Sequence, residues 1–268
     1  MADPALTRRQ RLGELVLSHG FLRVADASRM LGVSEVTVRA DLSLLETDGQ
    51  LTRVHGGAVP ATAVREFPLE QTVRQDADIK RRIGERAAAM VRSGESVLLD
   101  VGSTALAAAR ALVARDDLRD NVVITNGLSI ALALEPAIPR FTVVVIGGTL
   151  RPLQHSLVDP HATDALSALH ADVSLIGCNG VDAEAGVTNL NLAEAQVKRA
   201  MVRSSTRRIL LADASKLGRR HLGRIGALQD FDVLVTAGNP GEELLDPVRR
   251  CGVAVECADP GHRSGDRK

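Results

Sequence analysis

Apolar positions in the first sixty residues recur every three to four residues, which is typical of short amphipathic helices. The segment RRQRLGELVLSHG predicts one such helix, which ends at Gly20 because glycine suits a helix C-cap. Its apolar positions are Leu12, Leu15 and Val16. The segment VADASRMLG predicts a second, shorter helix that ends at Gly32.

A third helix is predicted for SEVTVRADLSLLETDG, with Ser34 as its N-cap and Gly49 after its last turn. Its apolar stripe consists of Val38, Leu42 and Leu45. The polar residues expected on its other faces are Glu35, Thr37, Arg39 and Asp41. The segment LTRVHGGAVP then predicts a short hairpin, or wing, with Gly56-Gly57 at its turn.

From Ile79 onward, short apolar runs alternate with alanine- and leucine-rich segments of helical periodicity. The predicted strands are SVLLDV, NVVITN, FTVVVIGG, DVSLIG, RRILLAD and DVLVTAG. Fully apolar strands separated by helices indicate a largely parallel sheet covered on both faces, in an α/β domain. Ligands of such sheets sit beyond the carboxyl ends of the strands. The predicted organisation is a mainly α domain at 5–60, a linker at 61–78, the α/β domain at 79–258 and a tail at 259–268.

The segment VLLDVGSTALAAARAL predicts a strand, a glycine turn with Ser103 and Thr104, and a helix. Free backbone N–H groups and the positive end of the helix dipole then meet at one place, which suits an anion such as a phosphate.

Composition narrows the possible partners. The chain carries 33 Lys and Arg against 33 Asp and Glu, and the first sixty residues carry seven Arg against seven acidic residues. Net charge therefore gives no support to nucleic-acid binding, which must be argued from placement. With no Trp, no Tyr and four Phe, the chain lacks platforms for stacking the bases of a single strand.

The same inventory bears on compartment and metals. No apolar run approaches the ~20 residues needed to span a bilayer, and the first residues lack the apolar core of a signal peptide. Cys178, Cys251 and Cys257 are odd in number and lack metal-ligand spacing. We therefore expect a cytoplasmic protein with reduced thiols, no membrane contact, no metal and no cofactor.

Two helices joined through LGVS form the arrangement of a helix-turn-helix, whose second helix enters the major groove by its N-terminal residues. The candidate DNA contacts from that helix, the wing and the first helix are Ser34, Glu35, Thr37, Arg39, Arg53, His55 and Arg8. The pattern alone fits a helical hairpin with a charged solvent face equally well.

The stretch VSEVTVRADLSLLETDGQLTRVHGGAVP resembles the DeoR family of bacterial transcriptional regulators. The family pattern runs Val-Ser-x-x-Thr-(Val/Ile)-Arg-x-Asp-Leu, then Leu-x-x-x-Gly, then Arg-x-His-Gly-Gly-Ala. One common form has a second Arg where this chain has Ala40, so a DNA contact is missing there. The resemblance covers most of the chain. It implies a winged helix-turn-helix fused to a sugar-phosphate-sensing domain, usually acting as a repressor.

The second region resembles the fold of ribose-5-phosphate isomerases. GST at 102–104 is similar to their phosphate loop, NGVDAE at 179–184 to a degraded Asp-Gly-Ala-Asp-Glu, and ADASK at 212–216 to a stretch they also carry. The candidate effector contacts are Asp100, Gly102, Ser103, Thr104, Asn126, Gly147, Gly148, Asp182, Glu194 and Lys216. Simpler roles exist for some of them: a tight turn at Gly147-Gly148, a solvent-facing Glu194, and a Lys216 paired with Asp213.

A sugar-phosphate isomerase needs a positioned carboxylate base and an electrophile for the oxyanion. Glu194 falls where the base would lie, but Asn179 replaces the first acidic residue of the isomerase motif. No Lys or Gly cluster lies between Asp182 and Glu194. We therefore predict a non-enzymatic repressor of carbohydrate genes, with double-stranded operator DNA, a phosphorylated sugar and further copies of itself as partners. The alternatives are an isomerase with an accessory helical domain, and a binding module whose first unit contacts proteins.

Overall fold

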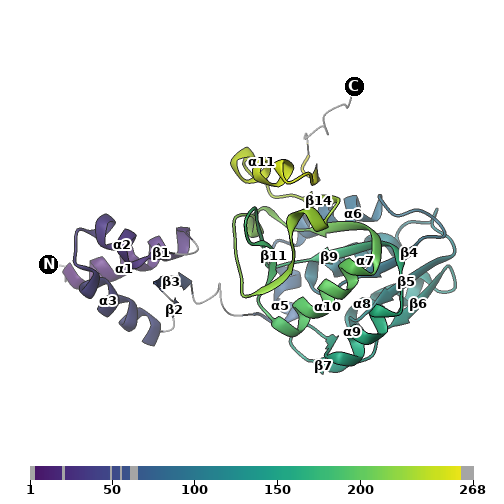
Figure 1. The fold of residues 1–268 in the computed structure, drawn as a ribbon, viewed down its shortest axis with the longest axis horizontal. Helices are drawn as coiled ribbons and strands as arrows, with labels where there is room; N and C mark the ends of the chain where they lie inside the picture. The colour runs from purple at the N-terminus through teal and green to yellow at the C-terminus, as the bar shows by residue number, and fades with distance from the viewer. Residues whose placement is uncertain (1–3, 20–21, 49, 55, 61–65, 261–268) are drawn as a thin grey trace. The chain divides into compact units, whose positions relative to one another are not determined.

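The computed structural model describes residues 4–19, 22–48, 50–54, 56–60 and 66–260. Figure 1 shows the fold of the chain. It divides into two compact units between Glu66 and Phe67, and each is described by itself.

The first unit is a winged helix-turn-helix, as predicted. Its elements are α1 (Pro4–His19), β1 (Leu22–Arg23), α2 (Val24–Leu31), α3 (Glu35–Thr47), β2 (Leu51–Val54) and β3 (Gly57–Pro60). The strands form an antiparallel sheet in the order β1-β3-β2, and β2 and β3 are the predicted wing. Ser34 caps α3, and Gly32 ends α2 in the left-handed conformation that glycine adopts freely. The predicted ends at Gly20 and Gly49 lie outside the described residues.

The core of the first unit contains the predicted apolar stripes of α1 and α3. Leu12, Val16, Val38, Leu42 and Leu45 are buried in one cluster with residues from α2 and the sheet. The prediction that Asp41 lies on a face other than the apolar stripe was wrong, because its side chain is buried. It is buried because Arg8 of α1 forms a two-pronged ion pair with it, at 2.6 Å from Nε and 3.2 Å from Nη2. This pair ties α1 to α3.

The second unit is built on a seven-stranded sheet in which every neighbouring pair is parallel. Its strands, in the order β15-β14-β12-β9-β4-β5-β6, are Ala254–Cys257, Val233–Thr236, Ser205–Leu211, Ala171–Gly177, Ser96–Leu99, Asn121–Thr125 and Phe141–Val145. All six predicted strands are confirmed. The edge strand β15 was not predicted.

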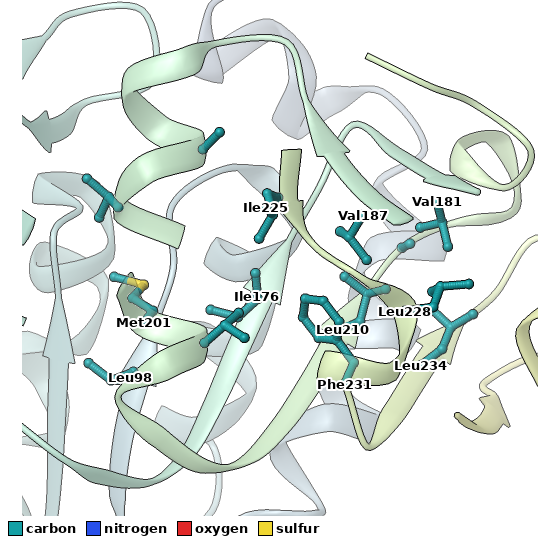
Figure 2. Packing of buried hydrophobic residues seen from close by; sticks show 14 of the residues in the cluster. Leu98, Ile176, Val181, Val187, Met201, Leu210, Ile225, Leu228, Phe231 and Leu234 are labelled. Carbon is teal, nitrogen blue, oxygen red and sulfur yellow. The ribbon is translucent and has the colours of Figure 1, made fainter. Parts of the chain in front are cut away.

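Helices cover both faces of this sheet, as predicted. They are α5 (Leu69–Arg74), α6 (Ala77–Ala88), α7 (Ser103–Val113), α8 (Leu128–Leu134), α9 (Pro160–Ser167), α10 (Leu192–Arg203) and α11 (Glu242–Arg250). One core lies between the sheet and α6, α7 and α8, and the other lies under α9, α10 and α11. Figure 2 shows the second core, with Met201 of α10 grouped with Leu98, Ile176 and Leu210 from neighbouring strands.

Two small antiparallel sheets were not predicted. β7 (Thr149–Arg151) pairs with β8 (Ser156–Val158) to form a hairpin after β6. β10 (Gly180–Asp182), β11 (Gly186–Asn189) and β13 (Gly223–Gly226) form a three-stranded sheet. Three single-turn 3₁₀ helices lie at Glu135–Ala137, Ala214–Lys216 and Leu228–Asp230.

The structure differs from both predicted ends of the α/β domain. The stretch 61–78 is not all linker, because it contains α5, whose Leu69 is buried, and the first residues of α6. The buried Lys80 of α6 holds the end of α5 by donating from Nζ to the carbonyls of Thr72 (2.6 Å) and Gln75 (2.5 Å). At the other end Asp259 accepts from the N–H groups of 238 and 239 and from Arg82. The tail therefore does not begin at 259.

Candidate functional site

The N-terminal end of α3 presents the predicted DNA contacts on an exposed surface. Ser34 accepts from the Thr37 N–H at 3.2 Å, and the two hydroxyls lie 2.9 Å apart. Glu35 and Arg39 form an ion pair at 2.9 Å, with about half of each side chain exposed. Because such an exposed pair contributes little stability, the Arg39 guanidinium is free to exchange Glu35 for a guanine edge or a phosphate.

The other basic candidates have partners within the first unit. Arg53 donates from Nη1 to the Ser43 hydroxyl at 2.6 Å, and its N–H donates to Glu46 at 2.7 Å. These bonds fasten the wing to α3. Arg8 is engaged with Asp41, so its first role is structural and its phosphate contact stays a prediction. His55 lies outside the described residues.

Sequence reasoning missed Val36, which is 75% exposed on the first turn of α3. An apolar side chain there is suited to contact with a thymine methyl group. The signal was available, because Val36 is an apolar residue that falls outside the stripe of Val38, Leu42 and Leu45.

In the second unit, several of the predicted effector residues lie at the carboxyl edge of the parallel sheet. Asp100 follows β4 and is fully buried. Its Oδ2 accepts from the Gly177 N–H at 2.9 Å and forms an ion pair with Lys198 of α10. Its Oδ1 is buried without a hydrogen-bond partner in the described part of the chain.

Lys198 is the strongest electrostatic feature that the sequence analysis missed. Burial alone would lower its pKa, but the carboxylates of Asp100 and Glu194 outweigh burial and raise it. The lysine is therefore charged and held between two acids. The signal in the sequence was the spacing of Glu194 and Lys198, which puts both on the helix face that also carries the apolar Met201.

Glu194 is buried rather than solvent-facing. Its Oε1 accepts from the Ser156 hydroxyl at 2.7 Å and pairs with Arg151, and its Oε2 lies 3.5 Å from the Asn189 amide nitrogen. The Asn191 side chain caps α10 by accepting from the Glu194 N–H at 3.0 Å. The carboxylate is thus held by a guanidinium, a hydroxyl and an amide.

Asn126 follows β5 and is also buried. Its side-chain nitrogen donates to the Leu157 carbonyl at 2.9 Å, whereas its Oδ1 has no hydrogen-bond partner within the residues described. Buried polar atoms are nearly always hydrogen-bonded, so an unpaired one at the ligand-binding edge of a parallel sheet indicates room for a donor from outside the chain.

The two glycines after β6 have different surroundings. A Cβ at Gly147 would meet open space. A Cβ at Gly148 would lie 2.4 Å from the Val158 carbonyl oxygen, so this glycine permits the close packing of β8. Gly148 therefore has a structural role, which is close packing against β8.

The anion site predicted at the start of α7 has the expected backbone. Gly102 has a φ of 101°, a conformation that favours glycine, and α7 begins at Ser103 without a side-chain cap. The first N–H groups of the helix are therefore left for water or a ligand. Ser103 and Thr104 are both half-buried at this point.

Lys216 lies near the same edge, on the 3₁₀ turn after β12. The pairing with Asp213 is absent: Asp213 accepts from Ser215 instead, and the Lys216 ammonium has no ion-pair partner among the residues described. Its charge acts on the partly buried Cys178, which follows β9, and on Lys80. Burial still raises the pKa of the Cys178 thiol to about 12, which keeps it neutral.

Asp182 does not join this group. Its Oδ1 accepts from the N–H groups of Glu184 and Ala185, and its Oδ2 pairs with Arg220 at 2.9 Å. Burial alone would raise its pKa, but these partners outweigh burial and lower it. Both carboxylate oxygens are therefore engaged in holding the turn between β10 and β11. This leaves Asp182 little capacity to accept hydrogen bonds from sugar hydroxyls. Asn179 is likewise structural, accepting from the Leu190 N–H at 2.9 Å.

Two general features complete the description. In the part of the chain that the structure describes, no three His, Cys, Asp or Glu side chains are grouped so as to hold a metal ion. Nor does any described helix have the length and apolar character needed to cross a membrane.

Comparison with known proteins gives two family matches. The model of the DeoR-like helix-turn-helix domain matches residues 8–64, and that of the DeoR C-terminal sensor domain matches residues 75–237. A transcriptional regulator of Haloferax volcanii, GlpR, is 35% identical over 92% of this chain and 96% of its own length. A putative aga operon transcriptional repressor of Escherichia coli O157:H7 is 31% identical over 92% of each chain. The glycerol-3-phosphate regulon repressor of Escherichia coli K12 is 27% identical over 87% of this chain and 90% of its own.

Among solved structures, the matches are slight. The sorbitol operon regulator SorC of Klebsiella pneumoniae covers 92% of this chain and 100% of its own at 12% identity, with a TM-score of 0.38. A ribose 5-phosphate isomerase of Plasmodium falciparum covers 52% of each chain at 18% identity, also with a TM-score of 0.38. Neither score supports a conclusion about activity.

Proposed function

The chain belongs to the DeoR family of transcriptional regulators, and on that premise we propose that a phosphorylated sugar or related metabolite controls its affinity for operator DNA. It is a DNA-binding transcriptional regulator, like the relatives that it matches over most of their length. The names of two of them refer to repression of the aga operon and of a glycerol-3-phosphate regulon. Those names support repression of carbohydrate genes by this chain.

The effector proposal rests on one observation: several polar groups at the carboxyl edge of the sheet lack a partner in the described part of the chain. An uncapped helix start at Ser103 and an unpaired ammonium at Lys216 suit a phosphate. The buried, unpaired oxygens of Asp100 and Asn126 suit sugar hydroxyls, which donate hydrogen bonds. The remaining candidates from the sequence, Gly102, Thr104, Gly147 and Glu194, surround the same edge, while Gly148 and Asp182 serve the local fold.

The state of Glu194 supports a sensor rather than an isomerase. A general base needs an oxygen that reaches the substrate proton. Here one carboxylate oxygen is occupied by Arg151 and Ser156, and the other faces Asn189. We infer that the site binds and does not catalyse, and that the protein acts without a cofactor.

On the DNA side, we propose that α3 lies in the major groove, with Ser34, Glu35, Val36, Thr37 and Arg39 at the base edges. A helix-turn-helix that reads repeated half-sites does so as an oligomer, so we propose that the protein is a homo-oligomer in the cytoplasm, where its operators lie. Effector binding favours an arrangement with lower operator affinity. By linkage, the operator then weakens effector binding by the same factor.

Replacing Arg39 by Ala tests the assignment of α3. We expect operator affinity to fall roughly tenfold. This is near the lower end of the ~1–3 kcal/mol typical of a base-contacting arginine, because Arg39 must break its ion pair with Glu35 before it binds DNA. Fluorescence anisotropy with a labelled operator at fixed salt measures the effect. The matched control is Arg110→Ala, which removes the same charge from α7 of the second unit. If Arg39→Ala binds operator with the same affinity as Arg110→Ala, α3 is not the element that reads DNA. A role of the first unit in protein contacts is then favoured.

A further inference from the structure

The β7–β8 hairpin contacts the proposed effector site through the residue pair that closes its turn. Arg151 and Ser156 face each other in the hairpin register, and both bind the same oxygen of Glu194. Beside them, the Leu157 N–H donates to the Asn126 carbonyl at 2.8 Å, and the Asn126 side chain donates back to the Leu157 carbonyl at 2.9 Å. Two residues assigned to the effector site therefore hold the hairpin directly.

The turn of the same hairpin, residues 152–155, holds the first residues of the second unit. The Leu153 carbonyl accepts from the Leu69 N–H at 2.9 Å, and the Gln154 side chain donates from Nε2 to the Phe67 carbonyl at 2.7 Å. His155 adds a contact of 3.4 Å between Nε2 and a Glu70 carboxylate oxygen. Phe67 is the first residue after the division between the units, so the chain that precedes it leads to the DNA-binding unit.

The hairpin has features that are typical of an element with more than one conformation. It comprises three residue pairs, and the pair that binds Glu194 directly flanks the turn. Two non-glycine residues that flank β8 have positive φ: His155 at 51° and Asp159 at 78°. Backbone in these sparsely populated regions persists only where surrounding contacts hold it, and it is common in segments that switch.

We propose that this hairpin couples the effector site to the segment 67–70, with Gln154 as the positioning residue that sets where the chain leaves the second unit. The proposal rests on the proposed function, because it uses the same site. A ligand phosphate at the edge competes with Glu194 for the Arg151 guanidinium, or a ligand hydroxyl donates to Glu194. Either event changes the bonds made by Arg151 and Ser156, and because this pair flanks the turn, the change passes directly to the turn.

The first test needs no effector. We compare hydrogen exchange of the full chain with that of Arg151→Gln, which weakens the bond between hairpin and Glu194. We expect the amides of 67–72 to exchange at least threefold faster, while core amides such as those of Leu98 and Ile176 stay protected. The control Arg220→Gln removes an exposed ion-pair partner from the β10–β11 turn and should leave 67–72 unchanged. If Arg151→Gln does not fold, Ser156→Ala makes the same comparison with a smaller loss.

The second test measures coupling itself. In Gln154→Leu, we expect operator affinity without effector to stay within twofold of wild type. We also expect the fold-change in operator affinity on adding glycerol 3-phosphate or ribose 5-phosphate to shrink at least threefold. Unchanged exchange at 67–72 in the Arg151 and Ser156 variants, or an undiminished response in Gln154→Leu, overturns the proposal. If neither probe changes the operator affinity of the wild-type chain, the result counts against effector control by these ligands. The hydrogen-exchange test then still decides the role of the hairpin.

Discussion

Replacing Lys198 by Met is expected to lower the free energy of unfolding of the sensor domain by about 3–5 kcal/mol, the typical cost of removing one member of a buried ion pair. Methionine fits the volume of the lysine stem, so the cost arises from charge rather than from a cavity. The substitution leaves Asp100 fully buried without its cationic partner, while the Gly177 N–H still donates to it. Chemical denaturation of the full chain measures the loss as the change in the sensor-domain transition.

The loss should depend on pH, with a definite sign. Burial raises the pKa of Asp100 even in the wild-type chain, and Lys198 opposes that rise. Without Lys198 the folded pKa moves further above the unfolded value, so the folded variant binds more protons and loses stability as pH rises through this interval. The deficit should therefore be smaller near pH 4–5 than near pH 7.5.

The double variant Asp100→Asn/Lys198→Met provides the control. Replacing both members of a buried pair by neutral groups is often close to neutral, and an asparagine oxygen can keep the bond from Gly177. We expect it to recover most of the stability that Lys198→Met loses. A single variant as stable as wild type, or a double variant no better than the single one, would contradict the buried ion pair described here.

Replacing Lys216 by Met is expected to weaken binding of a phosphorylated effector by about tenfold to a hundredfold. A hydrogen bond to a charged group contributes about 1.5–3 kcal/mol, and this ammonium has no competing ion-pair partner in the described chain. Operator affinity without effector should not change. Isothermal titration with the phosphorylated sugar and with its unphosphorylated form separates loss of the phosphate contact from general damage.

The matched control is Arg219→Met, which removes an exposed charge three residues away. It should leave effector affinity within about twofold of wild type, because general electrostatic attraction at that range is screened by salt. If Lys216→Met binds the phosphorylated ligand as tightly as Arg219→Met does, the phosphate lies elsewhere.

The sequence was most informative where one face or both faces of an element are buried. Five of the six predicted strands of the parallel sheet are runs of Val, Ile and Leu because helices cover both faces. The sixth, β6, lies at an edge of the sheet, and its apolar run marked it although Val144 and Val145 are exposed. The stripe of α3 was equally clear, because Val38, Leu42 and Leu45 all face one small core. The missed strand β15 is an edge strand whose residues are all only partly buried, so no such run marks it.

The sequence was least informative where a polar residue is buried by a distant partner. Asp41 is paired with a residue 33 positions away, and Asp100 with one 98 positions away. Periodicity describes only the neighbours of a residue along its own element, so it could not bring these partners together. The β7–β8 hairpin was missed for a related reason, since its strands have three residues each and include Arg151 and Ser156, whose partner Glu194 lies on α10.

The most direct test of the account is a titration of wild-type protein with its operator, with and without each member of a panel of sugar phosphates and their unphosphorylated counterparts. The account predicts that at least one phosphorylated compound lowers operator affinity by about fivefold or more, within the usual range of allosteric coupling, and that its unphosphorylated counterpart does not. Identical operator affinity with every member of the panel would contradict control of DNA binding by a phosphorylated ligand.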